Sequence, residues 1–373
     1  MKKVLKLIFS LTLLLVVAVA FTACNNDDDS NGGAATGQSN EVRIALIAHS
    51  PDSILDDGSF NQGAWAGIQR YLSSHGLNAS EHSMFFQPDA ADDVARIDLV
   101  NDAVEWGADI LVMPGFHFIA SLYDAQDLFP DTHFVLLDAT PAGASGPRIE
   151  RNVAAIHYAE EEAGFLAGYA IVMEGHRNLG FMGGIAVPAV VRFGHGFIQG
   201  AEHAAASLGL PAGEVTIDYM YLGGFAPDPV HQTTAASWFA TGTEVIFAAA
   251  GGAGNSVIAA AEAAGALVIG VDVDQAHLSN VVISSAMKAL DNSVYDMISD
   301  FVAGNFRGGN ELMFNASVDG IGLPMGTSRF ANFTQAQYNA IFGQLASGAI
   351  NVNASLEMSA IMPSISLVTV NEM

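Results

Sequence analysis

Short apolar runs alternate with amphipathic stretches along most of the chain. Val42–Ala48 is apolar enough for a buried strand, and the stretch 61–75 that follows places Ala64, Ile68 and Leu72 on one helical face. Strands separated by helices are typical of parallel sheets, so the pattern predicts an α/β fold. This first series has further predicted strands at Ile110–Met113, His133–Asp138 and Val153–His157, and predicted helices at 90–106 and 118–128.

A second series with the same rhythm begins near residue 178, without a recognisable sequence repeat. We therefore expect two lobes, one from 41–165 with a returning segment at about 285–325, the other from 166–284 with part of 326–373. The predicted strands of the second series are Leu179–Met182, Val215–Tyr221, Glu244–Ala249, Leu267–Val271 and Val281–Ser285. Helices are predicted at 190–208, 229–240, 255–264 and 330–347, and Ile361–Val370 is either a closing strand or a crossing between the lobes.

The N-terminus has the pattern of a secretory signal, with a basic start and an apolar run from Leu7 to Phe21. Phe21-Thr22-Ala23-Cys24 resembles a bacterial lipobox, in which cleavage precedes the cysteine and lipid is attached to it. The alternative is an uncleaved membrane anchor, for which the run is short. Residues 24–40 then form a polar, acidic tether, so the sequence predicts a lipid-anchored protein on the extracytoplasmic face of the cell membrane.

Composition narrows the class of partner. The 373 residues carry 13 Lys and Arg against 39 Asp and Glu, a formal charge of −26. Removing residues 1–23 takes away three of the 13 basic residues and no acid, which leaves a charge of about −29. Such a polyanion is unsuited to nucleic acid, and 51% hydrophobic residues exclude global disorder. Cys24 is the one cysteine, so the chain forms no internal disulfide.

Two aromatic residues stand in loops at the predicted carboxyl ends of strands, where ligands bind in open parallel sheets. Phe60 lies in the loop Asp56–Gln62, between Ser59 and Asn61, either of which is a candidate cap for the following helix. Phe225 lies in a glycine-rich loop of the second series. One ring from each lobe would suffice to sandwich a flat heterocycle.

Polar groups follow other strands of the second series. The loop Gly251–Asn255 offers backbone N–H groups but is neither a Walker A loop nor a dinucleotide-binding motif. Alternation along the strand predicts that Asp272 and Asp274 face one side, as a grip for vicinal hydroxyls or a metal. Lys288 is one of only ten basic residues left after cleavage. The histidines form no metal-binding pattern and no serine stands in a nucleophile elbow, so we expect no cofactor, no metal and no catalysis.

Taken together, these motifs resemble the basic-membrane-protein family of bacterial lipoproteins, purine nucleoside receptor type, which are substrate-binding proteins of ABC importers. The resemblance runs from about Val42 to at least Val302. The motifs that carry it, in order, are Asp57-Gly58-Ser59-Phe60-Asn61-Gln62, Glu162-Ala163-Gly164-Phe165-Leu166-Ala167-Gly168, Gly223-Gly224-Phe225, Ala250-Gly251-Gly252-Ala253-Gly254 and Gly270-Val271-Asp272-Val273-Asp274-Gln275.

The resemblance implies a type I periplasmic-binding-protein fold, two Rossmann-like lobes joined by a multi-stranded hinge. It implies a monomer that captures a nucleoside and passes it to an ABC permease and its ATPase. It also implies a ligand site, in which two aromatic rings sandwich the base, a polar side chain contacts it, and a carboxylate and a lysine hold the ribose. The residues that match are Asp57, Phe60, Asn61, Phe225, Gly251, Gly252, Asp272 and Lys288.

One departure concerns the base. Members of the family commonly carry an acid soon after the Gly-Phe-x-Phe motif, where it contacts the purine edge, and here Ala120 takes that position. Asp124 lies one helical turn further on, and His117 or Ser121 is an alternative contact to a different base edge. The ligand is therefore either a nucleoside, with a purine expected, or a sugar or other polyol.

Two further hypotheses remain open at this stage. A secreted nucleoside hydrolase would use Asp272 and Asp274 around a metal. A ligand sensor would keep the fold and signal to a membrane partner without transport.

Overall fold

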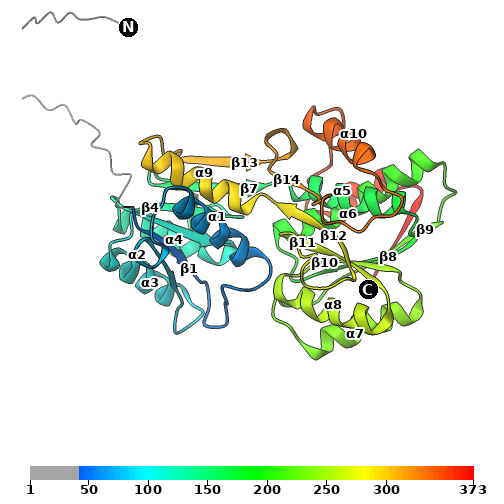
Figure 1. Cartoon of the computed structure of the whole chain (residues 1–373), viewed down its shortest axis with the longest axis horizontal. Helices are drawn as coiled ribbons and strands as arrows, with labels where there is room; N and C mark the ends of the chain where they lie inside the picture. Colours follow the sequence, from blue (N-terminus) through cyan, green and yellow to red (C-terminus); the bar gives the residue numbers. More distant parts are fainter. Residues whose placement is uncertain (1–41) are drawn as a thin grey trace, which may run out of the picture. The chain divides into compact units, whose positions relative to one another are not determined.

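The computed structural model describes residues 42–373, and Cys24 and the tether lie outside the described residues. Two main sheets form the framework, and Figure 1 shows helices on both faces of each. The first sheet is entirely parallel, in the order β13-β7-β4-β3-β1-β2. Its strands are β1 (Ile44–Ile47), β2 (Ser83–Phe86), β3 (Ile110–Pro114), β4 (His133–Leu137), β7 (Val153–Tyr158) and β13 (Asn310–Phe314).

The inner strands β1, β3, β4 and β7 are buried on both faces because they are apolar at nearly every position. On β1, Ile44 and Leu46 join one core and Ala45 and Ile47 join the other. Helices α1 (Phe60–Ser74) and α9 (Leu290–Val302) pack on the first of these faces, while α3 (Asp93–Trp106) and α4 (Ile119–Leu128) cover the second. We call this sheet and its helices the first lobe.

The second sheet has the order β14-β12-β11-β10-β8-β9-β15, and only β14 runs antiparallel to its neighbour. Its strands are β8 (Asn178–Gly183), β9 (Val215–Tyr221), β10 (Val245–Ala249), β11 (Leu267–Asp272), β12 (Val282–Lys288), β14 (Ile321–Gly322) and β15 (Val368–Glu372). Helices α5 (Glu160–Glu174) and α6 (Pro188–Leu208) cover one face, and α7 (Pro229–Thr241) and α8 (Gly254–Ala264) the other. We call this the second lobe, which also carries α10 (Gln335–Ala346).

The chain passes between the two lobes three times, after β7, after β12 and after β13. Backbone hydrogen bonds join the three crossing segments. Ala159 N donates to Phe314 O at 3.1 Å, and Ala289 N donates to Gly320 O at 2.9 Å. The three crossings therefore form one multi-stranded hinge, as the type I periplasmic-binding-protein fold requires.

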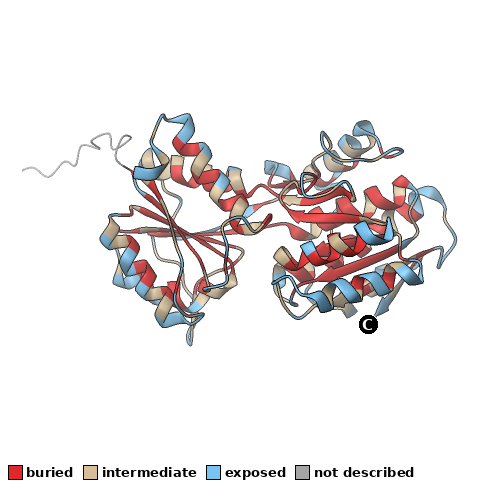
Figure 2. Cartoon of the chain, turned by 60° about the horizontal axis from the view of Figure 1, so that its bottom comes forward, coloured by how far each residue is buried: buried red, intermediate tan, exposed pale blue. Residues whose placement is uncertain are grey.

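The described chain also contains two small helices, α2 (Ala79–His82) and α11 (Met358–Ile361), and a short hairpin of β5 (Ala142–Gly143) and β6 (Gly146–Pro147). Figure 2 shows that the strands of both sheets are buried and that exposed residues gather on the outer sides of the helices. Within residues 42–373, no helix combines the length and the apolar character that a membrane crossing needs.

Most predicted elements are present within a few residues of the expected bounds, including β1, α1, β9 and α8. Of the two alternatives for Ile361–Val370, the closing strand is correct and the crossing between the lobes is not, because β15 adds to the edge of the second sheet beside β9. One interpretation was wrong. Lys288 does not follow its strand but is the last residue of β12.

Helices α5 and α6 are packed unusually closely, and glycine makes this possible. Gly164 and Gly168 on α5 lie against the carbonyls of Phe193 and Phe197 on α6, so an added Cβ would clash with them. The relation is reciprocal, since Gly196 and Gly200 on α6 lie against carbonyls of α5. The glycines of the Glu162–Gly168 motif are therefore required by packing between these helices.

We expect Gly168→Ala to lower the free energy of unfolding by about 1–3 kcal/mol, because its methyl group meets backbone atoms that have no room to move. The matched control is Gly343→Ala in α10, where nothing lies within 4 Å of the added Cβ. That substitution should raise the free energy of unfolding by about 0.5–1 kcal/mol. Denaturant unfolding of both variants measures the difference, and equal effects would contradict the packing argument.

Candidate ligand-binding site

A buried lysine occupies the point where the carboxyl ends of the two sheets meet the hinge. Lys288 ends β12 and is only 3% exposed. Its Nζ lies 2.5 Å from Asp138 Oδ2, 3.4 Å from Glu160 Oε1 and 3.6 Å from Asp272 Oδ1. Asp138 follows β4 in the first lobe, whereas Asp272 ends β11 in the second. One ammonium group therefore joins carboxylates from both lobes.

Two of these carboxylates depend on an unusual backbone conformation. Asp138 has φ 61° and Asp272 has φ 66°, in the left-handed region that side chains seldom occupy. Such a conformation costs on the order of 1 kcal/mol or more at a non-glycine residue. At both positions it ends a strand and turns a carboxylate toward Lys288.

Lys288 and its three carboxylates form a charge cluster, the Lys288 cluster, in which acidic groups outnumber the lysine. The pKa values of Asp138, Glu160 and Lys288 are shifted there. Burial raises the pKa of Asp138, and the neighbouring Glu160 adds to the effect. Burial also raises the pKa of Glu160, although Arg192 Nη1 lies 3.3 Å from its Oε2. Burial alone would lower the pKa of Lys288, but the three carboxylates raise it overall, so the lysine stays charged.

Aromatic rings surround the same ammonium group. The ring centroids of Phe60, Phe193 and Tyr158 lie 5.0, 5.2 and 5.5 Å from Lys288 Nζ. The faces of aromatic rings attract cations at such distances. The half-buried Phe60 thus lies beside the charge cluster, and its place in a ligand site stays a prediction.

The loop before α1 is held in place by its own side chains and by the second lobe. The Asp57 carboxylate accepts hydrogen bonds from the backbone N–H groups of Ser59, Asn61 and Gln62 at 2.8, 2.9 and 3.1 Å. Ser59 takes the N-cap position of α1, as the sequence allowed, but its side chain makes no capping hydrogen bond, and the Asp57 carboxylate provides the cap. Ser59 instead donates its hydroxyl to Asp272 Oδ2 at 2.6 Å.

Two further hydrogen bonds hold the loop before α1 in place. The side-chain amide of Gln275 donates to Gly58 O at 2.8 Å, across the two lobes. The side-chain amide of Asn61 donates to Ile54 O at 3.1 Å, and Asn61 is buried. The backbone that carries Phe60 is thus fixed on several sides.

Phe225 stands at the corresponding edge of the second lobe, in the loop that follows β9. Its half-buried ring contacts Gly184 and Gly251, and its carbonyl accepts a hydrogen bond from Ala253 N at 2.7 Å. Gly252 lies against the same carbonyl. The two glycines therefore adjoin Phe225, but within residues 42–373 no ring contact joins Phe225 to Phe60.

Asp274 does not share a face with Asp272. Its carboxylate accepts hydrogen bonds from Thr327 Oγ1 at 2.6 Å and from Ala276 N at 3.0 Å. The strand ends at Asp272, so the alternation that the sequence suggests does not extend to Asp274. This excludes the paired carboxylates on which the hydrolase hypothesis relied. Within residues 42–373 no group of three or more metal-ligating side chains is placed to hold a metal.

Four residues that surround Lys288 were not predicted from the sequence: Asp138, Tyr158, Glu160 and Phe193. Asp138 carried a usable signal, because it closes a predicted strand as Asp272 does. The other three come from the hinge and from α6, whose placement depends on how the lobes join.

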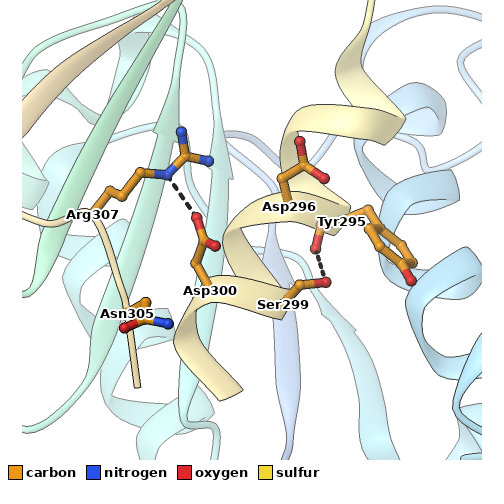
Figure 3. A pocket seen from close by; sticks show the side chains of 6 residues that line it. All are labelled: Tyr295, Asp296, Ser299, Asp300, Asn305 and Arg307. Atoms are coloured by element: carbon orange, nitrogen blue, oxygen red, sulfur yellow. Dashed lines mark hydrogen bonds and ion pairs between the residues drawn. The ribbon is translucent and has the colours of Figure 1, made fainter. Parts of the chain in front are cut away.

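A cavity of about 500 Å³ lies on α9 and the loop after it, and Figure 3 shows the side chains that line it. Arg307 Nε donates to Asp300 Oδ2 at 2.6 Å, and Ser299 donates to the carbonyl of Tyr295. None of the residues that line this cavity belongs to the Lys288 cluster. A second cavity of similar size lies beside His277.

We expect Lys288→Met to lower the free energy of unfolding by about 3–5 kcal/mol, because three buried carboxyls lose their common partner. The folded-state pKa values of Asp138 and Glu160 then rise further above their unfolded values. A raised folded-state pKa gives stability that is present at low pH and lost as the pH rises through it. The loss should therefore be larger at pH 8 than at pH 5.

Denaturant unfolding of the wild type and the variant at both pH values provides the measurement. The control is Arg70→Met, which removes a surface ion pair with Asp291. That variant should lose at most about 1 kcal/mol, with little dependence on pH in this range. An equal loss at pH 5 and pH 8 for Lys288→Met would contradict the account of the cluster.

Comparison with known proteins gives a consistent assignment. A family model described as ABC transporter substrate-binding protein PnrA-like matches residues 42–354. The ABC transporter nucleoside-binding protein BmpA of Lactococcus lactis is 28% identical over 310 residues, covering 78% of this chain and 84% of that protein. Basic membrane protein D of Borreliella burgdorferi is 27% identical over 304 residues, covering 80% of this chain and 83% of that protein.

Solved structures agree on the fold. A solute-binding protein of an ABC transporter system from Aeropyrum pernix superimposes with a TM-score of 0.71 at 20% identity, covering 86% of this chain and 96% of that one. Another from Conexibacter woesei gives a TM-score of 0.67 at 22% identity, covering 84% and 99%.

Proposed function

Because the chain belongs to the family of PnrA-like substrate-binding proteins of ABC transporters, we propose that it is a lipid-anchored receptor that captures a nucleoside. Proteins of this family bind a small solute for a permease and catalyse no reaction. The observation that carries the nucleoside proposal is the meeting of Phe60, Lys288 and Asp272 at the junction of the lobes. It combines a ring face with groups that bind hydroxyls.

The base would lie between two aromatic rings. Phe60 comes from the first lobe and Phe225 from the second, each in a loop at the carboxyl end of its sheet. Stacking of a base on an aromatic side chain contributes about 1–3 kcal/mol. Asn61 supports this face through its hydrogen bond to Ile54 O, and Asp57 through its cap on α1.

The sugar would lie toward the charge cluster. Asp272 and Lys288 offer an acceptor and a donor to vicinal hydroxyls, and Gly251 and Gly252 lie at a chain turn that leads into α8. A neutral ligand suits the cluster, whose carboxylates outnumber its cations and would repel a phosphate. This favours a nucleoside over a nucleotide.

Binding would be coupled to movement at the hinge. A ligand that contacts both lobes stabilises the closed state by the contacts it makes only there. The lipid anchor at Cys24 would keep the closed receptor near the permease on the extracytoplasmic face of the membrane.

A sugar or other polyol is the second candidate. It is supported by the acidic cluster, which matches hydroxyl groups, and by the missing acid at the exposed Ala120. Asp124 does not replace that acid, because it too is exposed on α4. A thermal-shift comparison of nucleosides with sugars distinguishes the two ligand classes.

We expect Phe225→Ala to weaken nucleoside binding by at least about tenfold, or ~1.4 kcal/mol, because one stacking face is lost. The matched control is Phe342→Ala, a half-buried phenylalanine on α10 that packs on Tyr338. Calorimetry with a nucleoside panel, preceded by mass spectrometry of the ligand released on denaturation, makes the measurement. Unchanged affinity in Phe225→Ala would remove this residue from the site.

We expect Cys24→Ala to release the protein from the membrane fraction, because the residue that carries the lipid is lost. Fractionation followed by immunoblotting measures the distribution. Asn25→Ala, next to the proposed acylation site, is the control and should stay with the membrane. Retention of Cys24→Ala in the membrane, resistant to salt and carbonate, would contradict the anchor.

A further inference from the structure

We propose that His117 contacts the edge of the bound base and selects which nucleoside binds, with His49 as its positioning residue. The inference rests on the proposed function, since it requires a ligand ring beside Phe60. It adds a specificity-determining contact to the proposed site.

The two histidines come together at the carboxyl edge of the first sheet. His49 follows β1, and His117 lies in the 3-10 turn Phe116–Phe118 that follows β3. These strands are neighbours and parallel, so their carboxyl ends lie side by side. The imidazole rings stack with their centroids 4.1 Å apart and their planes 4° apart.

The pair lies close to the proposed ligand ring. A methyl group placed on Gly115 would be 3.8 Å from Phe60 Cε1, so Phe60 covers the backbone just before the Phe116–Phe118 turn. The centroid of the same ring lies 5.0 Å from Lys288 Nζ. Gly115 directly precedes this turn, so a base stacked on Phe60 would lie next to the segment that carries His117.

Of the two rings, His49 is fixed and His117 is available. His49 contacts Ser53 Oγ through Nδ1 at 3.0 Å, and its carbonyl accepts a hydrogen bond from Arg96 Nε at 2.9 Å. Among the described residues, neither ring nitrogen of His117 has a hydrogen-bond partner, and the side chain is half-buried. Its polar atoms are thus free to meet a ligand.

Both imidazoles are neutral at physiological pH. Burial lowers the pKa of His49 and of His117 to about 4, and the nearby Arg96 guanidinium acts in the same direction. A neutral imidazole has one N–H donor and one acceptor nitrogen. That combination matches a base edge with an exocyclic amino or carbonyl group next to a ring nitrogen.

The neighbouring side chains do not compete for this role. Ser121 is buried and donates its hydroxyl to Phe118 O at 3.4 Å, inside its own helix. Ala120 has no polar group, and Asp124 is exposed. His117 is therefore the polar side chain of this turn that is left to contact a ligand.

The test compares ligands that differ only at the base edge. Calorimetry on the full chain would measure affinities for adenosine, inosine, cytidine, uridine and purine riboside, which lacks the exocyclic group. His117→Phe keeps a ring to stack on His49 but has no polar atom. We expect the preference for the best exocyclic-bearing nucleoside over purine riboside to fall about three- to tenfold in this variant.

A conservative variant and a remote control complete the design. His117→Asn keeps a donor and an acceptor, so we expect it to restore part of the preference. His277→Ala, an exposed histidine bonded to the carbonyl of Asp274, should leave every affinity unchanged.

The outcomes separate the two proposals. An equal loss for all five ligands in His117→Phe, or an unchanged preference, would overturn the role of His117 while the nucleoside proposal stands through Phe225. Absence of nucleoside binding by the wild type would overturn both.

Discussion

The structure depends on one buried cation at the junction of the lobes. Lys288 comes from the second sheet, yet the shortest of its ion pairs is with Asp138, which follows β4 of the first sheet. Removing charges from water is costly, and the cost is recovered only when each partner remains in place. The cluster therefore ties the end of β4, the start of α5 and the ends of β11 and β12 to one position. It lies where the chain crosses between the lobes, so the hinge and the proposed sugar site share the same atoms.

The loop with Phe60 is organised before any ligand binds. Asp57 caps α1, Ser59 is bonded to Asp272, and Gln275 is bonded to Gly58. A preformed site loses less conformational freedom on binding, which favours affinity. Phe225 is supported less extensively, by two glycines and one backbone hydrogen bond. The loop that carries Phe60 is therefore the more firmly fixed of the two aromatic loops.

Much of the fold could be predicted from the sequence, because strands buried on both faces read as continuous apolar runs. The predicted bounds of β9 match the structure, those of α1 are shifted by one residue at both ends, and those of α8 differ by one residue at the start. Strand β13 escaped prediction, since Asn310 and Glu311 are polar residues at the sheet edge. Helix α5 was not predicted, because nearly all its faces are apolar or acidic and its sequence therefore has no amphipathic period.

Candidate site residues at the ends of strands could be predicted from the sequence. Residues whose position depends on how the lobes join were harder to predict. Phe60, Asp272 and Lys288 are brought together as the family motifs imply. The role of Asp57 as a helix cap required the actual loop conformation. The contribution of Glu160 required knowledge that α5 begins at the hinge.

The glycine contacts between α5 and α6 have a mechanical consequence. Four glycines let two backbones touch without intervening side chains, so there are few rotatable groups between them to absorb a displacement. Because α5 starts at a crossing segment, this close contact couples α6 to any rotation of α5 about the hinge.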